Sequence, residues 1–187
     1  MVIKEHIREG LSALKPRKLT EGFTRQAAVL MPILEWEREF HFLLTLRTKE
    51  VQTHKGQISF PGGMREGEEA LMDTAIRETF EEVGIERDRI EILGRFHDYV
   101  SITNFRVTTF AAFLHPPFTL KPQITEVAEV LHVPFSTFLN PSCMRVEKST
   151  YSNKEIDVYY YSFGSHQIWG LTARIIKDFL DTLQLRP

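Results

Sequence analysis

The segment from Ala70 to Val83 constrains the fold more than any other part of the sequence. Plotted at about 100° per residue, as in an α-helix, its apolar residues and Thr79 occupy one half of the circumference. Glu78, Glu81 and Glu82 occupy an adjoining arc about 100° wide. A helix that is apolar on one side buries that side, so the pattern predicts a helix packed on a larger layer, with three carboxylates along one edge.

Strand-like runs precede and follow this helix. The helical pattern extends from about Gly67 to Val83, and Gly84 follows in the position of a helix-ending residue. Further helical patterns lie at about 2–14 and at 171–183, so we expect an α/β fold with a mixed sheet between helices. The strand-like runs are 27–36, 41–48, 90–97, 105–115, 127–133 and a late hairpin, 158–169.

The length of 187 residues suits one domain and is short for two. The sequence contains no internal repeat, low-complexity tract or Gly/Ser linker, so we expect residues 1–187 to form a single domain. The C-terminal helical segment is amphipathic, and we expect its apolar side to lie in the core or on a homodimer surface. Its apolar residues include Ile175, Ile176, Phe179 and Leu180.

The charge balance excludes several classes of protein. There are 25 acidic and 23 basic residues, and this balance argues against a nucleic acid or an anionic membrane as the main partner. No run approaches 18 apolar residues, and the N-terminus lacks the apolar core of a secretory signal, so we expect a cytoplasmic protein. The single cysteine, Cys143, excludes an intramolecular disulfide and any multi-cysteine metal site.

The three carboxylates need compensation, because like charges three or four residues apart on a helix repel each other. Arg77 lies one turn before Glu81 and can pair with it, but one cation does not neutralise three anions. Oxygen ligands without clustered Cys or His favour Mg²⁺ or Mn²⁺ over Zn²⁺. The helix alone is equally compatible with a solvated acidic face, which is what most runs of glutamate form.

The residues around the helix favour the metal interpretation. From Gly63 the sequence runs GMREGEEALMDTAIRETFEEVGI, which resembles the Nudix box, Gly-x5-Glu-x7-Arg-Glu-U-x-Glu-Glu-x-Gly-U, where U is a bulky aliphatic residue. Thr79 departs from this pattern at the first U, and we expect its hydroxyl to donate to the Ala75 carbonyl. The matching residues of this segment, 63–85, are Gly63, Glu69, Arg77, Glu78, Glu81, Glu82, Gly84 and Ile85.

The resemblance implies the Nudix fold, an α/β/α sandwich, and a hydrolase of small-molecule nucleoside diphosphates linked to another group. It implies Mg²⁺ or Mn²⁺ as cofactor. The ligands would be Glu78 and Glu82, with Glu81 as a ligand or water-mediated partner and the Gly63 backbone carbonyl completing the shell.

The resemblance also implies roles beside the metal. Glu69 and Arg77 would be structural and would orient the carboxylates, with Glu69 at the start of the helix. Water activated by the cation would attack phosphorus. In Nudix enzymes the general base is a box glutamate or an acid on a downstream loop. We favour Glu82 as a ligand that also serves as base, with Glu81 and Glu126 as the other candidates.

Residues 43–63, LLTLRTKEVQTHKGQISFPGG, resemble the upstream motif of the coenzyme A pyrophosphatase branch of the Nudix family, Leu-Leu-Thr-x-Arg-Ser/Ala-x3-Arg-x3-Gly-x3-Phe-Pro-Gly-Gly. Residues 168–176, IWGLTARII, resemble its Trp-Gly-x-Thr-Ala segment. These resemblances imply coenzyme A or a derivative as substrate, cleaved to 3′,5′-ADP and 4′-phosphopantetheine.

The phosphates of such a substrate require cations, which Arg47, Lys49 and Lys55 supply in one short region. Gln52 stands where the motif has an arginine, and a neutral amide binds phosphate more weakly. The substrate is therefore open between coenzyme A and another nucleoside diphosphate derivative, such as ADP-ribose, NADH, a dinucleoside polyphosphate or an oxidised nucleotide. A non-catalytic nucleotide-sensing module is disfavoured, because all three box carboxylates are retained.

Overall fold

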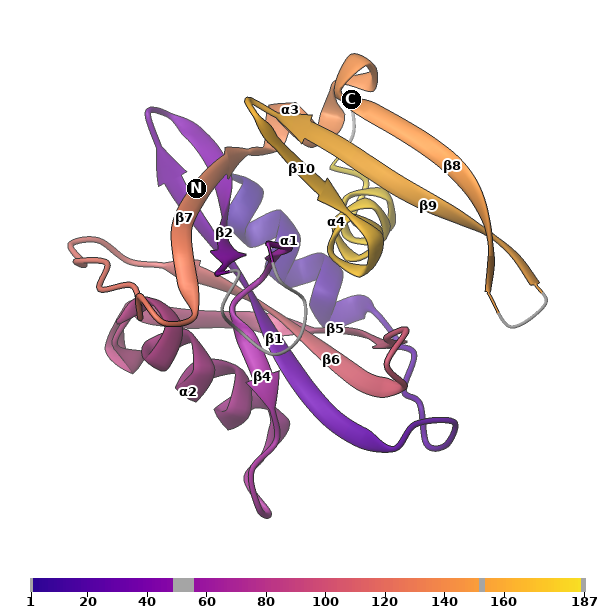
Figure 1. The fold of residues 1–187 in the computed structure, drawn as a ribbon. Helices are drawn as coiled ribbons and strands as arrows, with labels where there is room; N and C mark the ends of the chain where they lie inside the picture. Colours follow the sequence, from indigo (N-terminus) through magenta and orange to yellow (C-terminus); the bar gives the residue numbers. More distant parts are fainter. Residues whose placement is uncertain (1, 49–55, 152–153, 186–187) are drawn as a thin grey trace.

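A computed structural model describes residues 2–48, 56–151 and 154–185 (Figure 1). Two short 3₁₀ turns, Arg87–Arg89 and Pro141–Cys143, complete its secondary structure. The helices are α1 (Val2–Ala13), α2 (Leu71–Val83), α3 (Phe135–Leu139) and α4 (Gly170–Thr182). The strands are β1 (Arg25–Trp36), β2 (Glu39–Arg47), β3 (Ile58–Ser59), β4 (Gly62–Met64), β5 (Ile90–Val100), β6 (Phe105–Leu114), β7 (Val127–Pro134), β8 (Met144–Tyr151), β9 (Lys154–Phe163) and β10 (His166–Trp169).

The central seven-stranded sheet is mixed, as predicted. β1 runs parallel to β6 and antiparallel to β2, with which it forms a hairpin. The hairpin turns through Glu37 and Arg38, both at positive φ (51° and 66°), which is the backbone twist that a two-residue hairpin loop requires.

β1 and β2 pair directly only next to their turn, between 33–36 and 39–42. Further from the turn the two strands separate. β4 pairs with the edge of β1 that faces β2, and β3 pairs with the edge of β2 that faces β1. The backbone N–H of Leu30 donates to Pro61 O at 2.9 Å within this gap. The split therefore places the Gly62–Gly63 backbone inside the sheet rather than at its rim.

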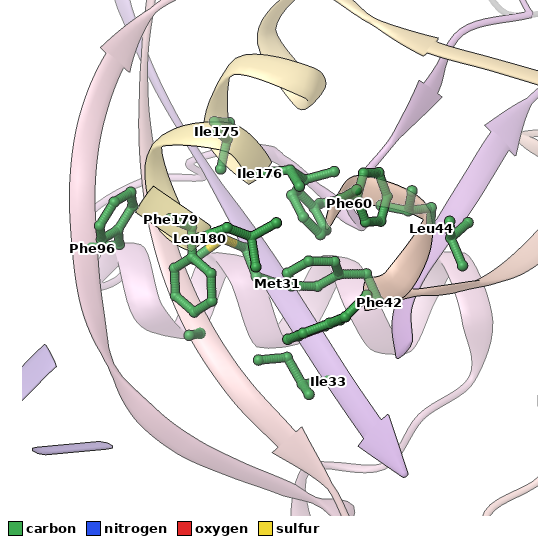
Figure 2. Packing of buried hydrophobic residues seen from close by; sticks show 14 of the residues in the cluster. Met31, Ile33, Phe42, Leu44, Phe60, Phe96, Ile175, Ile176, Phe179 and Leu180 are labelled. Carbon is green, nitrogen blue, oxygen red and sulfur yellow. The ribbon is translucent and has the colours of Figure 1, made fainter. Parts of the chain in front are cut away.

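Helices cover both faces of the sheet. α2 packs on one face, where Ala75 lies against Ala28 and Leu30. On the opposite face, Phe179 of α4 lies in one cluster with Met31 of β1 (Figure 2). This arrangement confirms the predicted α/β/α sandwich, and it follows from the alternation of side chains along β1.

Residues from both ends of the chain share the larger of these clusters. Ile7 of α1 is fully buried in it, so the N-terminal helix shares this cluster with α4. The apolar residues of α4 pack within the chain, as the core alternative predicted. No helix in the described ranges is long and apolar enough to cross a membrane. The α4 residues in the cluster are Ala173, Ile175, Ile176, Phe179 and Leu180.

One helix boundary and one strand differ from the prediction. α2 begins at Leu71 rather than near Gly67, because Glu69 holds the residues before it in a turn: its carboxylate accepts from the Glu66 backbone N–H at 2.9 Å. β8 was not predicted, and it pairs with β9 in a separate three-stranded sheet with β10. Its exposed Val146 lies among charged residues, so it lacks the apolar run by which the other strands were found.

Two details of α2 were predicted correctly. The buried Thr79 hydroxyl donates to the Ala75 carbonyl at 2.7 Å. Gly84 adopts the left-handed conformation (φ 74°) and ends the helix, with its N–H donating to Phe80 O at 2.8 Å.

Candidate active site

The acidic edge of α2 faces β4, the short strand in the split of the sheet (Figure 1). A Cβ placed on Gly63 would lie 2.3–2.4 Å from the carboxyl atoms of Glu78. Such a distance is far inside van der Waals contact, so any side chain at this position would displace the Glu78 carboxylate. The Gly63 backbone and the Glu78 carboxylate are thus in direct contact, as the predicted ligand set requires.

Arg77 connects α2 to the loop before it. Its guanidinium donates to Glu69 at 2.9 Å, to Glu78 at 3.0 Å, to Glu81 at 2.9 Å and to the Met64 backbone carbonyl at 3.1 Å. The hydrogen bond to Glu69 is the largest of the effects that raise the pKa of Arg77. Arg77 therefore fixes the helix against the end of β4, in agreement with the expected orienting role.

Glu69 is saturated with donors. Its carboxylate accepts from Arg77, from the Glu66 backbone N–H and from the Thr74 hydroxyl, the last two at 2.9 Å each. These bonds, first among them the one from Arg77, lower the pKa of Glu69 to about 2. Glu69 lies just before the helix, as expected. Thr74 was not predicted as its partner, although its place five residues after Glu69 could have suggested it.

Glu82 has the opposite environment. It is only 2 % exposed, and Arg47 donates to its Oε1 at 3.1 Å. Its Oε2 is buried and has no hydrogen-bond partner within the part of the chain that the structure describes. Burial raises the pKa of Glu82 to about 8, although Arg47 opposes the shift. A buried carboxylate oxygen without a donor is rare in folded proteins and indicates a missing partner.

The other two box carboxylates are graded from partly buried to exposed. Burial raises the pKa of Glu78, and the charge of Arg77 opposes this shift. The Glu81 side chain is 53 % exposed at the rim of the helix and is paired with Arg77. The three predicted acids thus lie on one edge, but they differ in their access to water.

Arg47 reaches the site because successive side chains along β2 point to opposite faces of the sheet. Leu43, Thr45 and Arg47 lie on the same side of β2, and Leu43 packs with Val83 of α2. At the end of the strand the Arg47 guanidinium lies 3.9 Å from Glu126 as well as against Glu82. This pairing was not predicted, although alternation along β2 carried the signal.

Glu126 lies in the turn before β7. Its backbone carbonyl accepts from the Thr48 N–H at 2.9 Å, which ties the turn to the end of β2. Its side chain is 49 % exposed. The structure therefore brings together a box glutamate, an arginine and a downstream acid. The predicted substrate residues Lys49, Gln52 and Lys55 lie outside the described residues.

The donor set suits a hard divalent cation. Within the described ranges, no three His, Cys, Asp or Glu side chains are grouped closely enough to hold a metal ion. Glu78 and Glu81 form ion pairs with Arg77, whereas Glu82 forms one with Arg47. The unpartnered Glu82 Oε2, the neighbouring carboxylates and the Gly63 backbone nevertheless provide only oxygen ligands, which Mg²⁺ and Mn²⁺ prefer. These residues fit the cation that the sequence predicted.

Comparison with known proteins places the chain in a family. The model of the NUDIX domain family matches residues 24–148. The protein named "uncharacterized Nudix hydrolase NudL" of Photorhabdus laumondii is 33 % identical, over 91 % of this chain and 90 % of that protein. A relative of the same name from Citrobacter koseri is 33 % identical over 87 % of this chain and 85 % of its own length.

Solved structures share the fold at low sequence identity. A MutT/nudix family protein from Enterococcus faecalis superposes with a TM-score of 0.57 at 16 % identity, over 90 % of this chain and 65 % of that one. An Ap4A hydrolase from C. elegans superposes with a TM-score of 0.52 at 20 % identity, over 60 % of this chain and 82 % of that one. At these identities the likeness concerns the fold alone.

Proposed function

This chain belongs to the Nudix family of pyrophosphohydrolases, and from that premise we propose that it cleaves the diphosphate of coenzyme A or its derivatives with Mg²⁺ or Mn²⁺. The products would be 3′,5′-ADP and 4′-phosphopantetheine. One observation carries the chemistry: the buried Oε2 of Glu82 has no donor among residues 2–48, 56–151 and 154–185, and it lies on the helix edge whose neighbouring acid, Glu78, touches Gly63.

A divalent cation, when bound, neutralises the diphosphate and polarises the attacked phosphorus. Glu78 and Glu82 would hold it, with Glu81 at the solvent side and the Gly63 carbonyl beside Glu78. Arg77 and Glu69 keep the helix edge in place, because their hydrogen bonds join it to the end of β4. The oxygen of water forms the new bond to phosphorus, and the bridging P–O bond breaks with its electron pair leaving on the departing phosphate.

The proton of the attacking water requires a base. The Glu126 side chain is more exposed than that of Glu82 and lies near the same arginine, Arg47. It can therefore take up the proton and pass it to solvent. Glu82 is bound to Arg47 through one oxygen and is the better candidate for a ligand. We therefore assign the base to Glu126 and keep Glu81 as the alternative at the rim.

The preference for coenzyme A rests on the two sequence resemblances outside the box. The end of the upstream motif, Phe60–Gly63, leads directly into β4 beside Glu78. The second segment begins at the end of β10, which contacts β3, the strand just before Phe60. Both segments therefore border the split in the sheet, which supports their belonging to one substrate site.

Gln52 favours a second candidate, a different nucleoside diphosphate derivative such as ADP-ribose or NADH. An arginine at this position would bind a phosphate through two hydrogen bonds, whereas the glutamine amide is neutral. Replacing Gln52 by Arg tests this point directly. We expect a lower KM for coenzyme A in Gln52→Arg if the missing arginine limits binding.

A substrate panel with Mg²⁺ or Mn²⁺ decides between the candidates. Initial rates are compared for coenzyme A, acetyl-coenzyme A, ADP-ribose, NADH and diadenosine polyphosphates, and products are identified by mass spectrometry. We expect kcat/KM to be highest for coenzyme A or its thioester. A rate for ADP-ribose equal to or above that for coenzyme A contradicts the substrate assignment but leaves the hydrolytic chemistry in place.

A further inference from the structure

Among the described residues, Arg47 provides the positive charge nearest to two acids of the site. Its guanidinium donates to Glu82 Oε1 at 3.1 Å and lies 3.9 Å from Glu126 Oε2. The first contact is a hydrogen-bonded ion pair, and the second is too long for a hydrogen bond. The two acids come from different parts of the chain, α2 and the turn before β7, and Arg47 of β2 is the residue that links them.

The backbone of Arg47 is fixed, so its side chain is aimed by the sheet. The Arg47 N–H donates to Gln57 O at 3.0 Å, and its carbonyl accepts from the Gly56 N–H at 3.2 Å. A β-bulge interrupts the pairing of β2 with β7 between Leu46 and Arg47, where bulges often set the direction of a side chain near an active site. The contacts of the guanidinium within the described ranges are with side chains, those of Glu82 and Glu126.

When Glu82 is ionised and no metal is bound, a cation is needed at this place, because the side chain is almost completely buried. A buried carboxylate without a counter-charge is strongly destabilising. Arg77 already contacts Glu69, Glu78 and Glu81, and no described contact joins it to Glu82. Arg47 therefore supplies the charge that Glu82 and Glu126 need in the metal-free protein.

A divalent cation at Glu82 Oε2 and the guanidinium at Oε1 would lie on the two oxygens of one carboxylate. At such a separation the two positive charges repel each other, even with substantial screening. A guanidinium that leaves Glu82 still presents several parallel N–H donors, which suit the oxygens of a diphosphate.

We propose that Arg47 is a displaceable counter-cation: it neutralises Glu82 and Glu126 before the metal binds, and it turns to the substrate diphosphate once the metal replaces it. This inference rests on the proposed metal-dependent diphosphatase activity. It differs from a simple substrate-binding role, because it requires Arg47 to compete with the metal. It also differs from a structural salt bridge, which would hold the ligand and strengthen metal binding.

The test measures Mg²⁺ binding in the absence of substrate by isothermal titration calorimetry at pH 9, above the pKa of about 8 of Glu82. Because the loss of Arg47 raises this pKa, the protons released on binding are measured in the same titration, and the affinities are compared for the ionised carboxylate. Removing a competing charge in Arg47→Met should tighten Mg²⁺ binding at least about threefold. The same variant should raise KM for the diphosphate substrate by about tenfold or more, because the anion loses its arginine. Arg47→Lys keeps the charge and should stay within about twofold of the wild-type Mg²⁺ affinity.

Arg87→Met is the matched control. Arg87 pairs with Asp73 at the outer side of α2 and is 64 % exposed, so its loss should leave both the Mg²⁺ affinity and KM unchanged. Circular dichroism establishes that each variant is folded. If Arg47→Met does not fold, Arg47→Gln replaces it, because the glutamine amide can still donate to Glu82, and the expected direction is the same.

The outcomes separate the inference from the function on which it rests. Wild-type protein that binds no Mg²⁺ overturns the proposed function. Wild-type binding that is unchanged or weaker in Arg47→Met overturns the inference alone: unchanged binding leaves Arg47 as a substrate contact only, and weaker binding leaves it as a support for Glu82. Tighter Mg²⁺ binding together with a raised KM supports the inference.

Discussion

Two glutamates of this protein lie among basic residues, and their pKa values move in opposite directions. Glu91 of β5 accepts hydrogen bonds from Lys4, Arg8 and His115. Burial opposes its ionisation, but these donors outweigh burial and lower its pKa to about 2. Glu82 has one such donor, Arg47, and burial raises its pKa to about 8.

The difference lies in how many donors each carboxylate has for its degree of burial. Both carboxylate oxygens of Glu91 accept hydrogen bonds. One donor, Arg8 of α1, lies 83 residues before Glu91 in the sequence, so the contact joins α1 to the sheet. Glu82 is more deeply buried, and one of its oxygens has no donor among the described residues. A satisfied acid stabilises the fold, whereas an unsatisfied one destabilises the empty protein and gains a partner only when a ligand binds.

The largest expected effect is on catalysis by Glu82→Gln. An amide is a much poorer ligand for a divalent cation, so kcat should fall by about 10³-fold or more with the fold intact. Glu91→Gln should leave kcat unchanged. The measurements are steady-state kinetics with Mg²⁺ and circular dichroism.

The matched acid for this experiment is Glu68, which is fully exposed in the loop before α2 and pairs only with Arg65 among the described residues. Glu68→Gln should retain wild-type kcat. If Glu82→Gln also retains most of its activity, Glu82 is not a metal ligand, and the contrast with Glu91 has no functional meaning.

The second prediction concerns the stability of the metal-free protein. Since folding raises the pKa of Glu82 from its ordinary 4.5 to about 8, its favourable contribution is complete below about pH 4.5 and is lost as the pH rises through 8. Glu82→Gln should therefore exceed wild type in unfolding free energy by about 3 kcal/mol at pH 9, with no difference near pH 4. Urea unfolding in EDTA measures both values.

Added Mg²⁺ should reduce this stability difference at pH 9, because the cation binds the folded wild type and not the variant. A variant that is less stable than wild type in EDTA at pH 9 would show that Glu82 is already satisfied in the empty protein. The comparison with Glu91 would then fail on its central point.

The third prediction applies the same reasoning to Glu91 with the opposite sign. Its folded pKa of about 2 lies below 4.5, so its contribution is present above about pH 4.5 and is lost as the pH falls towards 2. Glu91→Gln should lower the unfolding free energy by about 1–2 kcal/mol at pH 7, after allowance for its partial exposure, and by almost nothing near pH 2. A loss that persists at pH 2 would assign the effect to packing instead of charge.

This contrast also separates what was predictable from what was not. Helical periodicity and the box pattern placed Glu78, Glu81 and Glu82 on one edge, because residues three and four apart share a helix face. Runs of apolar residues predicted most strands of the sheet, because such runs, like helical spacing, can be recognised from neighbouring positions in the sequence. The opposite environments of Glu82 and Glu91 depend on contacts between distant segments.

Long-range contacts explain the remaining differences. Arg8 and Glu91 have no sequence spacing that marks them as a pair, since they meet only when α1 packs on β5. The pairing of Arg47 with Glu82 needs both the face of β2 and the position of α2. β8 forms because β9 pairs with it, and its own residues carry little apolar signal.

The smallest prediction tests whether a satisfied polar group on α2 itself behaves neutrally. Thr79 lies one turn before Glu82 and Val83 and is fully buried, but its hydroxyl donates to the Ala75 carbonyl. Val has nearly the same shape, and the carbonyl keeps its helical N–H donor, so removing the hydroxyl leaves no polar group without a partner. Thr79→Val should change the unfolding free energy by no more than about 0.5 kcal/mol and should leave kcat unchanged. Thermal unfolding and kinetics at pH 7 check both values.

A large loss of activity in Thr79→Val would mean that the carboxylate edge of α2 is sensitive to any change in the buried side of the helix. The effect of Glu82→Gln could then no longer be assigned to the carboxylate alone.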